Sequence, residues 1–139
     1  MTALLTIGML PVLLVVLAST LELGALRVVS ARAHSAADLA VLVAVNDQDD
    51  AAFARTGRLQ LAPDAAAMAR AVFADNLEGI RSELAATPGA IAADADVRVD
   101  PIAATVRISA VVPVRTPIFG ALFFRPVTQV AIKTAGGDR

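Results

Sequence analysis

The sequence predicts an α+β protein, in which one long N-terminal helix precedes a small domain of helix and antiparallel sheet. Three observations predict this class. A strongly apolar, uncharged run opens the chain, apolar residues then recur at helical spacing, and the last third alternates apolar and polar residues with a period of two. At 139 residues, the chain has room for one small domain and an appendage.

The first predicted element is a membrane or stalk helix over residues 1–45. No charge occurs before Glu22, so 21 uncharged residues would span about 31 Å as a helix, close to the roughly 30 Å hydrocarbon core of a bilayer. A single-pass anchor is the favoured interpretation. Pro11 is tolerated as a local kink in a membrane helix, and Gly8 leaves space for that bend or for another helix.

Two other interpretations of the apolar run are weaker. A cleaved secretory signal is disfavoured because no basic segment precedes the run and the helical pattern continues past it. A buried core helix is disfavoured because so small a domain could hardly surround it. Arg27 and Arg32 follow the run, so the positive-inside rule places the C-terminal part in the cytoplasm if Met1 is the translation start. A removed basic leader would reverse this orientation.

Residues 46–139 predict a small α+β domain. The polar stretch "NDQDD" ends the first helix and begins a loop over 46–62, and a second helix follows over 63–86. "TPG" stops that helix, whose apolar stripe comprises Met68, Val72, Phe73, Leu77 and Ile80. Three antiparallel strands fall within 95–134, with a turn at Asp100-Pro101 and the second strand beginning at Ile102. The helices are expected to cover the apolar face of this sheet.

A compact apolar segment lies between the second and third predicted strands. Two interpretations of it are open: a loop folded back on the core, or an exposed tip that enters a partner or a membrane surface. The candidate contact residues are Arg115, Ile118, Phe119, Leu122, Phe123, Phe124 and Arg125.

The sequence contains no pattern typical of catalysis, metal binding or cofactor binding. The only histidine, His34, is interpreted as a surface residue weakly paired with Asp38, which lies one helical turn later. The absence of cysteine excludes disulfides and thiolate metal sites. A net charge of −1, with 12 basic residues spread along the chain, argues against nucleic-acid binding. We therefore predict a non-enzymatic protein without cofactors.

The N-terminal segment resembles the TadE/TadG-like minor pseudopilins of the tight-adherence (Flp, type IVc) pilus system. The resemblance rests on Leu10-Pro11 in the apolar run, Glu22-Leu23-Gly24 after it, Arg27 and Arg32, and the tract Ala36–Ala40. It implies a pilin-like fold and a structural subunit of a type IV pilus or a related secretion apparatus. It also implies other pilin-like subunits and an inner-membrane assembly platform as partners.

The same resemblance implies a location and a set of assembly residues. The protein would cross the inner membrane once, with an extracytoplasmic C-terminal domain, and would reach the cell surface in the pilus. Residues expected to act in helix packing and assembly are Met1, Leu5, Gly8, Pro11, Glu22, Gly24 and Arg27.

Leu5 departs from the family pattern, in which many members carry a glutamate six residues before the proline. This spacing makes Met1 the mature first residue, consistent with a removed leader. The family's carboxylate is thought to neutralise the terminal ammonium of a neighbouring subunit, so its absence predicts a position at the filament tip. Two alternatives remain: a secretion accessory protein that does not polymerise, and a lipid- or ligand-binding module that uses the 118–124 segment.

Overall fold

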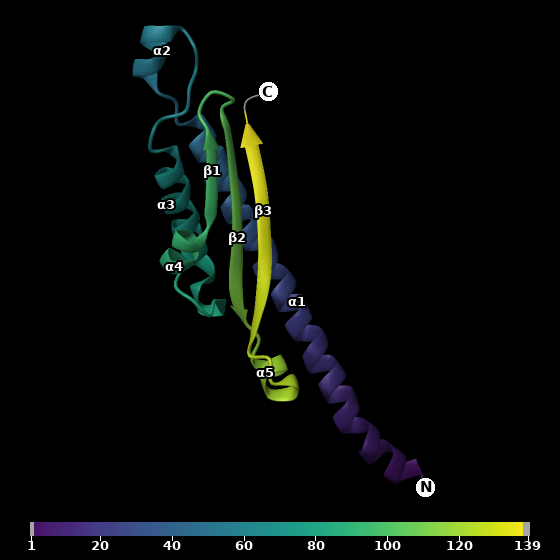
Figure 1. Cartoon of the computed structure of the whole chain (residues 1–139). Helices are drawn as coiled ribbons and strands as arrows, with labels where there is room; N and C mark the ends of the chain where they lie inside the picture. Colours follow the sequence, from purple (N-terminus) through teal and green to yellow (C-terminus); the bar gives the residue numbers. More distant parts are fainter. Residues whose placement is uncertain (1, 138–139) are drawn as a thin grey trace.

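The computed structural model describes the backbone of residues 2–137 and the side chains of residues 8–137. Its dominant element is the helix α1, Thr2–Asn46, which continues through Pro11 without a break. Figure 1 shows α1 packed along the domain with its N-terminal half projecting beyond it. With a long apolar helix, further helices and a three-stranded antiparallel sheet, the chain has the predicted α+β class.

The second half of α1 buries a face made mostly of alanine. Small side chains allow neighbouring elements to approach the helix backbone closely. The buried residues of this face are Val29, Ala33, Ala36, Ala37, Ala40, Val41 and Ala44. Val43 is only half-buried, whereas Val41 and Ala44 on either side of it are buried.

The sheet has the order β1-β2-β3, with both neighbouring pairs antiparallel. Its strands are β1 (Asp96–Asp100), β2 (Thr105–Arg115) and β3 (Val127–Gly137). Ile102 does not begin the second strand as predicted, and its side chain is 82% exposed. The reason is a turn held by the Asp100 carboxylate, which accepts hydrogen bonds from the backbone N–H groups of Ile102 (3.0 Å) and Ala103 (2.9 Å).

The helices that follow α1 differ from the prediction in number and in length. A short helix α2, Asp50–Thr56, lies inside the region expected to be a loop, because the Asp49 side chain caps it by accepting from the N–H of Ala52. The second long helix α3 covers only Ala65–Leu77, and a 3₁₀ segment, Glu78–Glu83, follows it.

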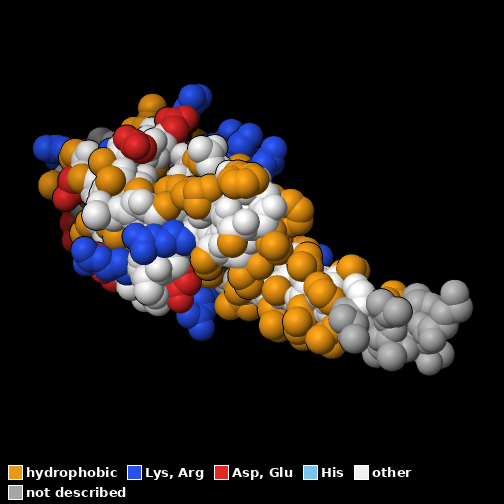
Figure 2. All heavy atoms as spheres, turned by 90° about the horizontal axis from the view of Figure 1, so that it is seen from below, with side chains coloured by type: hydrophobic (Ala, Val, Ile, Leu, Met, Phe, Trp, Pro, Cys, Tyr) orange, Lys and Arg blue, Asp and Glu red, His pale blue; other side chains and the backbone are white. Residues whose placement is uncertain are grey.

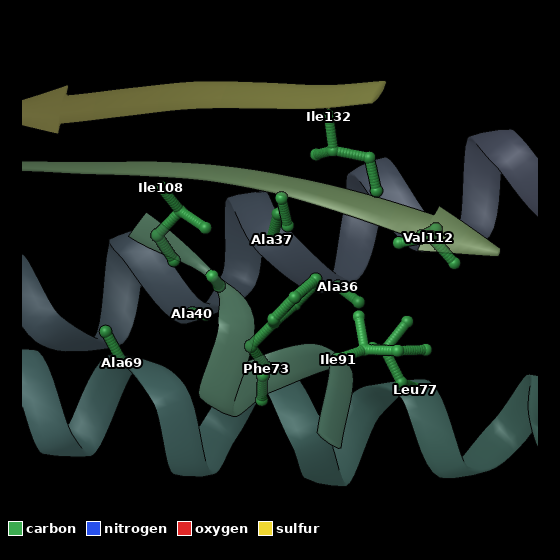
Figure 3. Packing of buried hydrophobic residues seen from close by; sticks show 14 of the residues in the cluster. Ala36, Ala37, Ala40, Ala69, Phe73, Leu77, Ile91, Ile108, Val112 and Ile132 are labelled. Atoms are coloured by element: carbon green, nitrogen blue, oxygen red, sulfur yellow. The ribbon is translucent and has the colours of Figure 1, made fainter. Parts of the chain in front are cut away.

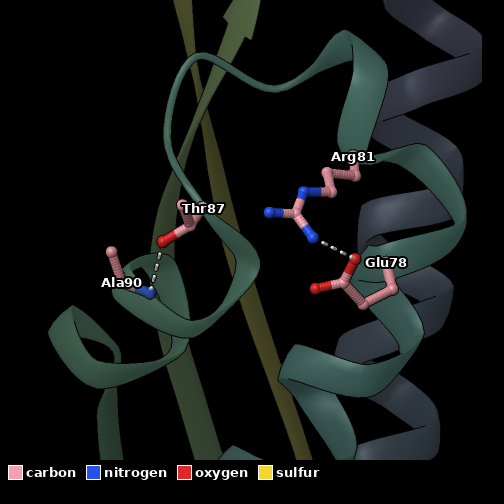
Figure 4. A network of polar contacts seen from close by, with 4 residues as sticks. All are labelled: Glu78, Arg81, Thr87 and Ala90. Atoms are coloured by element: carbon pink, nitrogen blue, oxygen red, sulfur yellow. Dashed lines mark hydrogen bonds and ion pairs between the residues drawn. The ribbon is translucent and has the colours of Figure 1, made fainter.

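The "TPG" stretch begins a helix rather than only ending one. Thr87 accepts a hydrogen bond from the N–H of Ala90 (3.3 Å), and Pro88 occupies the first turn of α4, Pro88–Asp94. Figure 4 shows this cap and the exposed ion pair between Glu78 and Arg81. A Thr-Pro pair therefore fits the start of α4 as well as the end of the preceding segment.

The core lies where α1 and α3 meet the inner face of the sheet (Figure 3). The buried stripe of α3 and the following turn is Ala65, Ala69, Phe73, Leu77 and Ile80. Met68, predicted in this stripe, is 39% exposed because the alanines at 65 and 69 face α1 instead. β2 contributes Val106, Ile108, Ala110, Val112 and Val114, which is the alternation that the sequence predicted.

Candidate functional site

The first notable surface is the projecting half of α1. Among the described residues, one helix is long and apolar enough to cross a membrane, judged by length and composition, and only 6% of its most apolar window is buried. A core helix of a soluble protein would be mostly buried. Figure 2 shows apolar side chains spread over the visible face of this projection, up to the residues drawn in grey. The exposed large apolar residues are Met9, Leu10, Val12, Leu13, Leu14, Val15, Val16, Leu17, Leu21 and Leu23.

Glu22 lies at the end of this surface and joins α1 to the short helix α5, Pro117–Phe123. Its side chain is buried, with 6% exposure. Its two carboxylate oxygens accept hydrogen bonds from the N–H groups of Ile118 (2.8 Å) and Phe119 (2.5 Å). These donors lie in the first turn of α5, where helix N–H groups have no partner within the helix. A carboxylate there also interacts favourably with the helix dipole.

Glu22 therefore binds α5 rather than Arg27, the first basic residue after the apolar run. Across residues 8–137, ion pairs form only between Glu78 and Arg81 and between Asp96 and Arg98. Arg27 is exposed on α1. Thr116, the N-cap residue of α5, makes no side-chain bond to the helix, so Glu22 supplies the cap from 96 positions away in the sequence.

The loop that carries α5 is closed at its base by Thr116. Its hydroxyl donates to the carbonyl of Arg125 (2.8 Å), and its backbone N–H donates to the carbonyl of Pro126 (2.8 Å). Gly120 packs so closely on Pro126 that an added Cβ would lie 3.0 Å from the proline Cα. These contacts hold α5 as a compact unit at the end of the sheet.

The predicted contact segment is divided by the structure into two parts. Ile118 and Phe119 are half-buried beside Glu22, whereas Leu122 (38%), Phe123 (58%) and Phe124 (91%) are exposed. The rings of Phe119 and Phe123 make an edge-to-face contact with centroids 5.9 Å apart. Arg115 and Arg125, which bracket the segment, are exposed as well.

An apolar groove of about 860 Å³ lies between α1, the 3₁₀ segment and the base of α5. Glu22 is one of its few charged neighbours, with Glu83 and Arg115. Its apolar walls include Leu21, Leu26, Val29, Val114, Ile118 and Val127. The groove therefore continues the apolar surface of α1 into the domain.

Three of the remaining predicted assembly residues, Gly8, Pro11 and Gly24, lie on exposed parts of α1. Gly8 and Gly24 have open space where a Cβ would be, and Pro11 is exposed. Met1 lies outside the described residues, and for Leu5 only the backbone, within α1, is described. Sequence reasoning found Glu22 but missed its bond to α5. The signal was a carboxylate directly after an apolar run, combined with an α5 start that has no local cap.

His34 and Asp38 do not pair as the sequence suggested. The Nδ1 atom of His34 lies 3.0 Å from the carbonyl oxygen of Ser30, one turn earlier in α1. Asp38 instead accepts a hydrogen bond from the hydroxyl of Thr134 on β3 (2.5 Å). This contact ties α1 to the edge strand of the sheet, which is a structural role.

Together, the fold and the site define a class: an α+β domain carried on a long helix whose free half is apolar on its surface. The family model described as "Putative Flp pilus-assembly TadE/G-like" matches residues 1–47, which contain the whole of α1 and so include Glu22. This match confirms the resemblance over the N-terminal segment and indicates a protein related to pilus assembly with a structural role. Comparisons with curated proteins and with solved structures gave no match.

Proposed function

We propose that the protein is a minor pseudopilin-like structural subunit of a Tad-type pilus or a related secretion apparatus. One observation supports this most strongly. The segment that matches the pilus-assembly family is a helix whose first half exposes apolar side chains. Such a surface needs lipid or other apolar helices around it, because exposing so large an apolar area to water is unfavourable.

In this proposal α1 works in two environments. Before assembly, the residues up to Leu21 cross the inner membrane and the domain after α1 lies outside the cytoplasm. After assembly, the same surface packs against other pilin-like helices. The open space beside Gly8 and Gly24 supports the second state, because small residues allow helix backbones to approach closely. The carboxylate of Glu22 hinders neither state, since α5 already covers it.

Position in the filament depends on Leu5 in this proposal. A subunit without the carboxylate that pairs with a neighbour's terminal ammonium is best tolerated at the tip, where no further subunit needs that pair. We expect the wild-type protein at low copy at filament ends. Labelling along whole filaments at high copy would contradict the tip position, while leaving the subunit role intact. Leu5→Glu is expected to allow incorporation along the filament.

Crosslinking in cells tests the partners. The chain has no cysteine, so Gly24→Cys introduces one reactive thiol on the exposed surface of α1. Ala54→Cys, on α2 at the opposite end of the molecule (Figure 1), is the control. We expect the Gly24→Cys variant to capture other pilin-like helices and the control to capture none. Capture of a polytopic membrane protein alone would favour a secretion accessory protein that does not polymerise.

Membrane anchoring predicts a large effect of charge on the projecting half of α1. Val16→Arg should make membrane insertion less favourable by up to about 2.5–3.5 kcal/mol, because an arginine inside the membrane-spanning part of a helix is costly. Val111→Arg is a matched control, since Val111 is exposed on the sheet to nearly the same extent as Val16 (55% and 57%). Detergent phase separation of the two variants and the wild type measures the difference. A wild-type chain found wholly in the aqueous phase would contradict anchoring.

A further inference from the structure

An exposed aromatic tip is formed by Leu122 and Phe123 at the end of α5 and by Phe124 directly after it. Its last residue has two unfavourable features that the fold does not require. Phe124 is 91% exposed, and its backbone adopts a left-handed conformation (φ 57°) at the C-terminal cap of α5. Glycine is the usual residue at such a position, because a side chain is strained there. Strain and exposure together at an aromatic residue point to a role outside the folded domain.

The contact between Glu22 and α5 fixes the position of this aromatic tip along α1. Glu22 is the first charge after the uncharged run, so in a membrane-inserted chain it lies where the helix leaves the hydrocarbon core. Its carboxylate binds the first turn of α5 directly. Figure 1 shows α5 at the end of the sheet nearest the projecting half of α1. The tip is thereby held at the level of the membrane surface.

We propose that this aromatic tip, formed by Leu122, Phe123 and Phe124, inserts into the headgroup–acyl boundary of the bilayer that holds α1. This inference rests on the proposed membrane anchoring. Lipid is the occupant because the tip continues an apolar surface that already requires lipid, and because the exposed Arg115 and Arg125 flank it as cations that suit anionic headgroups. The domain would then contact the membrane at two points, α1 and α5, which restricts its tilt and rotation before assembly.

The composition of the chain permits a direct test, because it contains neither tryptophan nor tyrosine. Three full-length variants, Phe124→Trp, Phe53→Trp and Leu14→Trp, each carry a single fluorophore. They are reconstituted into vesicles of phosphatidylcholine and phosphatidylglycerol, with and without bromine on the acyl chains near the headgroup. Phe53 is the control, since it is 49% exposed on α2 at the far end of the domain.

We expect bromolipid to quench the Phe124→Trp variant at least twofold, with a blue-shifted emission, and to leave the Phe53→Trp variant unchanged. The Leu14→Trp variant should be quenched as well, because Leu14 lies in the proposed span. If the Leu14→Trp variant is quenched but the Phe124→Trp variant behaves like the control, the inference about α5 is wrong and anchoring stands. If the Leu14→Trp variant is not quenched, the proposed anchoring itself fails.

A second measurement separates lipid contact from a change in folding. Phe124→Gly removes the aromatic ring and suits the left-handed backbone, so it should preserve or increase the stability of the domain in detergent. A tryptophan at the neighbouring position, introduced by Phe123→Trp, should then lose at least half of its bromolipid quenching when Phe124→Gly is added. Unchanged quenching in the folded double variant would overturn the contribution of Phe124.

Discussion

Replacing Phe73 with alanine is expected to lower the free energy of unfolding by about 3–5 kcal/mol, because it leaves a cavity in a core that cannot collapse to fill it. Phe73 has no exposed surface and is among the largest fully buried side chains of the domain. Figure 3 shows it reaching from α3 toward the alanine face of α1. The alanine side chains are too short to reach into the space that Phe73 leaves. Little repacking is therefore available.

The control for this prediction is Met68→Ala on the same helix. Met68 is 39% exposed, so its replacement should cost well under half as much as that of Phe73. Chemical denaturation of both variants in detergent, monitored by circular dichroism, gives the two values. Equal losses would show that the sequence-based stripe, which placed Met68 and Phe73 together in the core, describes α3 better than the alanine-lined arrangement does.

The regular elements were predictable wherever one periodicity continued without interruption. The apolar alternation around Val106, Ile108 and Val112 specifies β2 and its buried face, and the alanine spacing after Val29 specifies the buried face of α1. Both patterns are local and depend only on which side of the chain meets the core. The family resemblance lies in the same helix, and the match over residues 1–47 confirms it there.

The elements that were missed depend on single hydrogen bonds rather than on periodicity. Asp49 caps α2 within a stretch read as a polar loop, Thr87 begins α4 at a point read as a stop, and Asp100 delays the second strand beyond Ile102. In each case a short polar side chain can either end one element or begin the next. Residue type alone does not distinguish these roles, because both use the same donor and acceptor geometry.

The sequence predicted which residues belong to the candidate site, but it did not predict that they contact one another. The sequence marked Glu22 and the apolar segment around Phe119 separately, as parts of two different features. Their contact joins residues 96 and 97 positions apart, and no local pattern encodes it. As a consequence, the carboxylate of Glu22, which ends the apolar run, is shielded from solvent by α5, the helix that carries the exposed aromatic tip.

Replacing Glu22 with alanine is therefore expected to release α5 from α1 without unfolding the core. The change leaves two N–H donors, those of Ile118 and Phe119, without their acceptor, and each such loss costs about 1–3 kcal/mol. The contact between α1 and α5 should thus weaken by about 2–6 kcal/mol. The core around Phe73 shares no hydrogen bond with Glu22, so its stability should change little.

Amide hydrogen exchange in detergent measures this release. In Glu22→Ala, exchange at Ile118 and Phe119 should accelerate by about 30-fold or more, since each 1.4 kcal/mol corresponds to tenfold. Glu22→Gln, which keeps one acceptor oxygen, should give an intermediate value. Glu78→Ala is the control, because it removes an exposed carboxylate whose ion pair with Arg81 contributes about 0.2–1 kcal/mol. Unchanged exchange at both amides in Glu22→Ala would mean that Glu22 does not hold α5, and the membrane level assigned to the aromatic tip would lose its support.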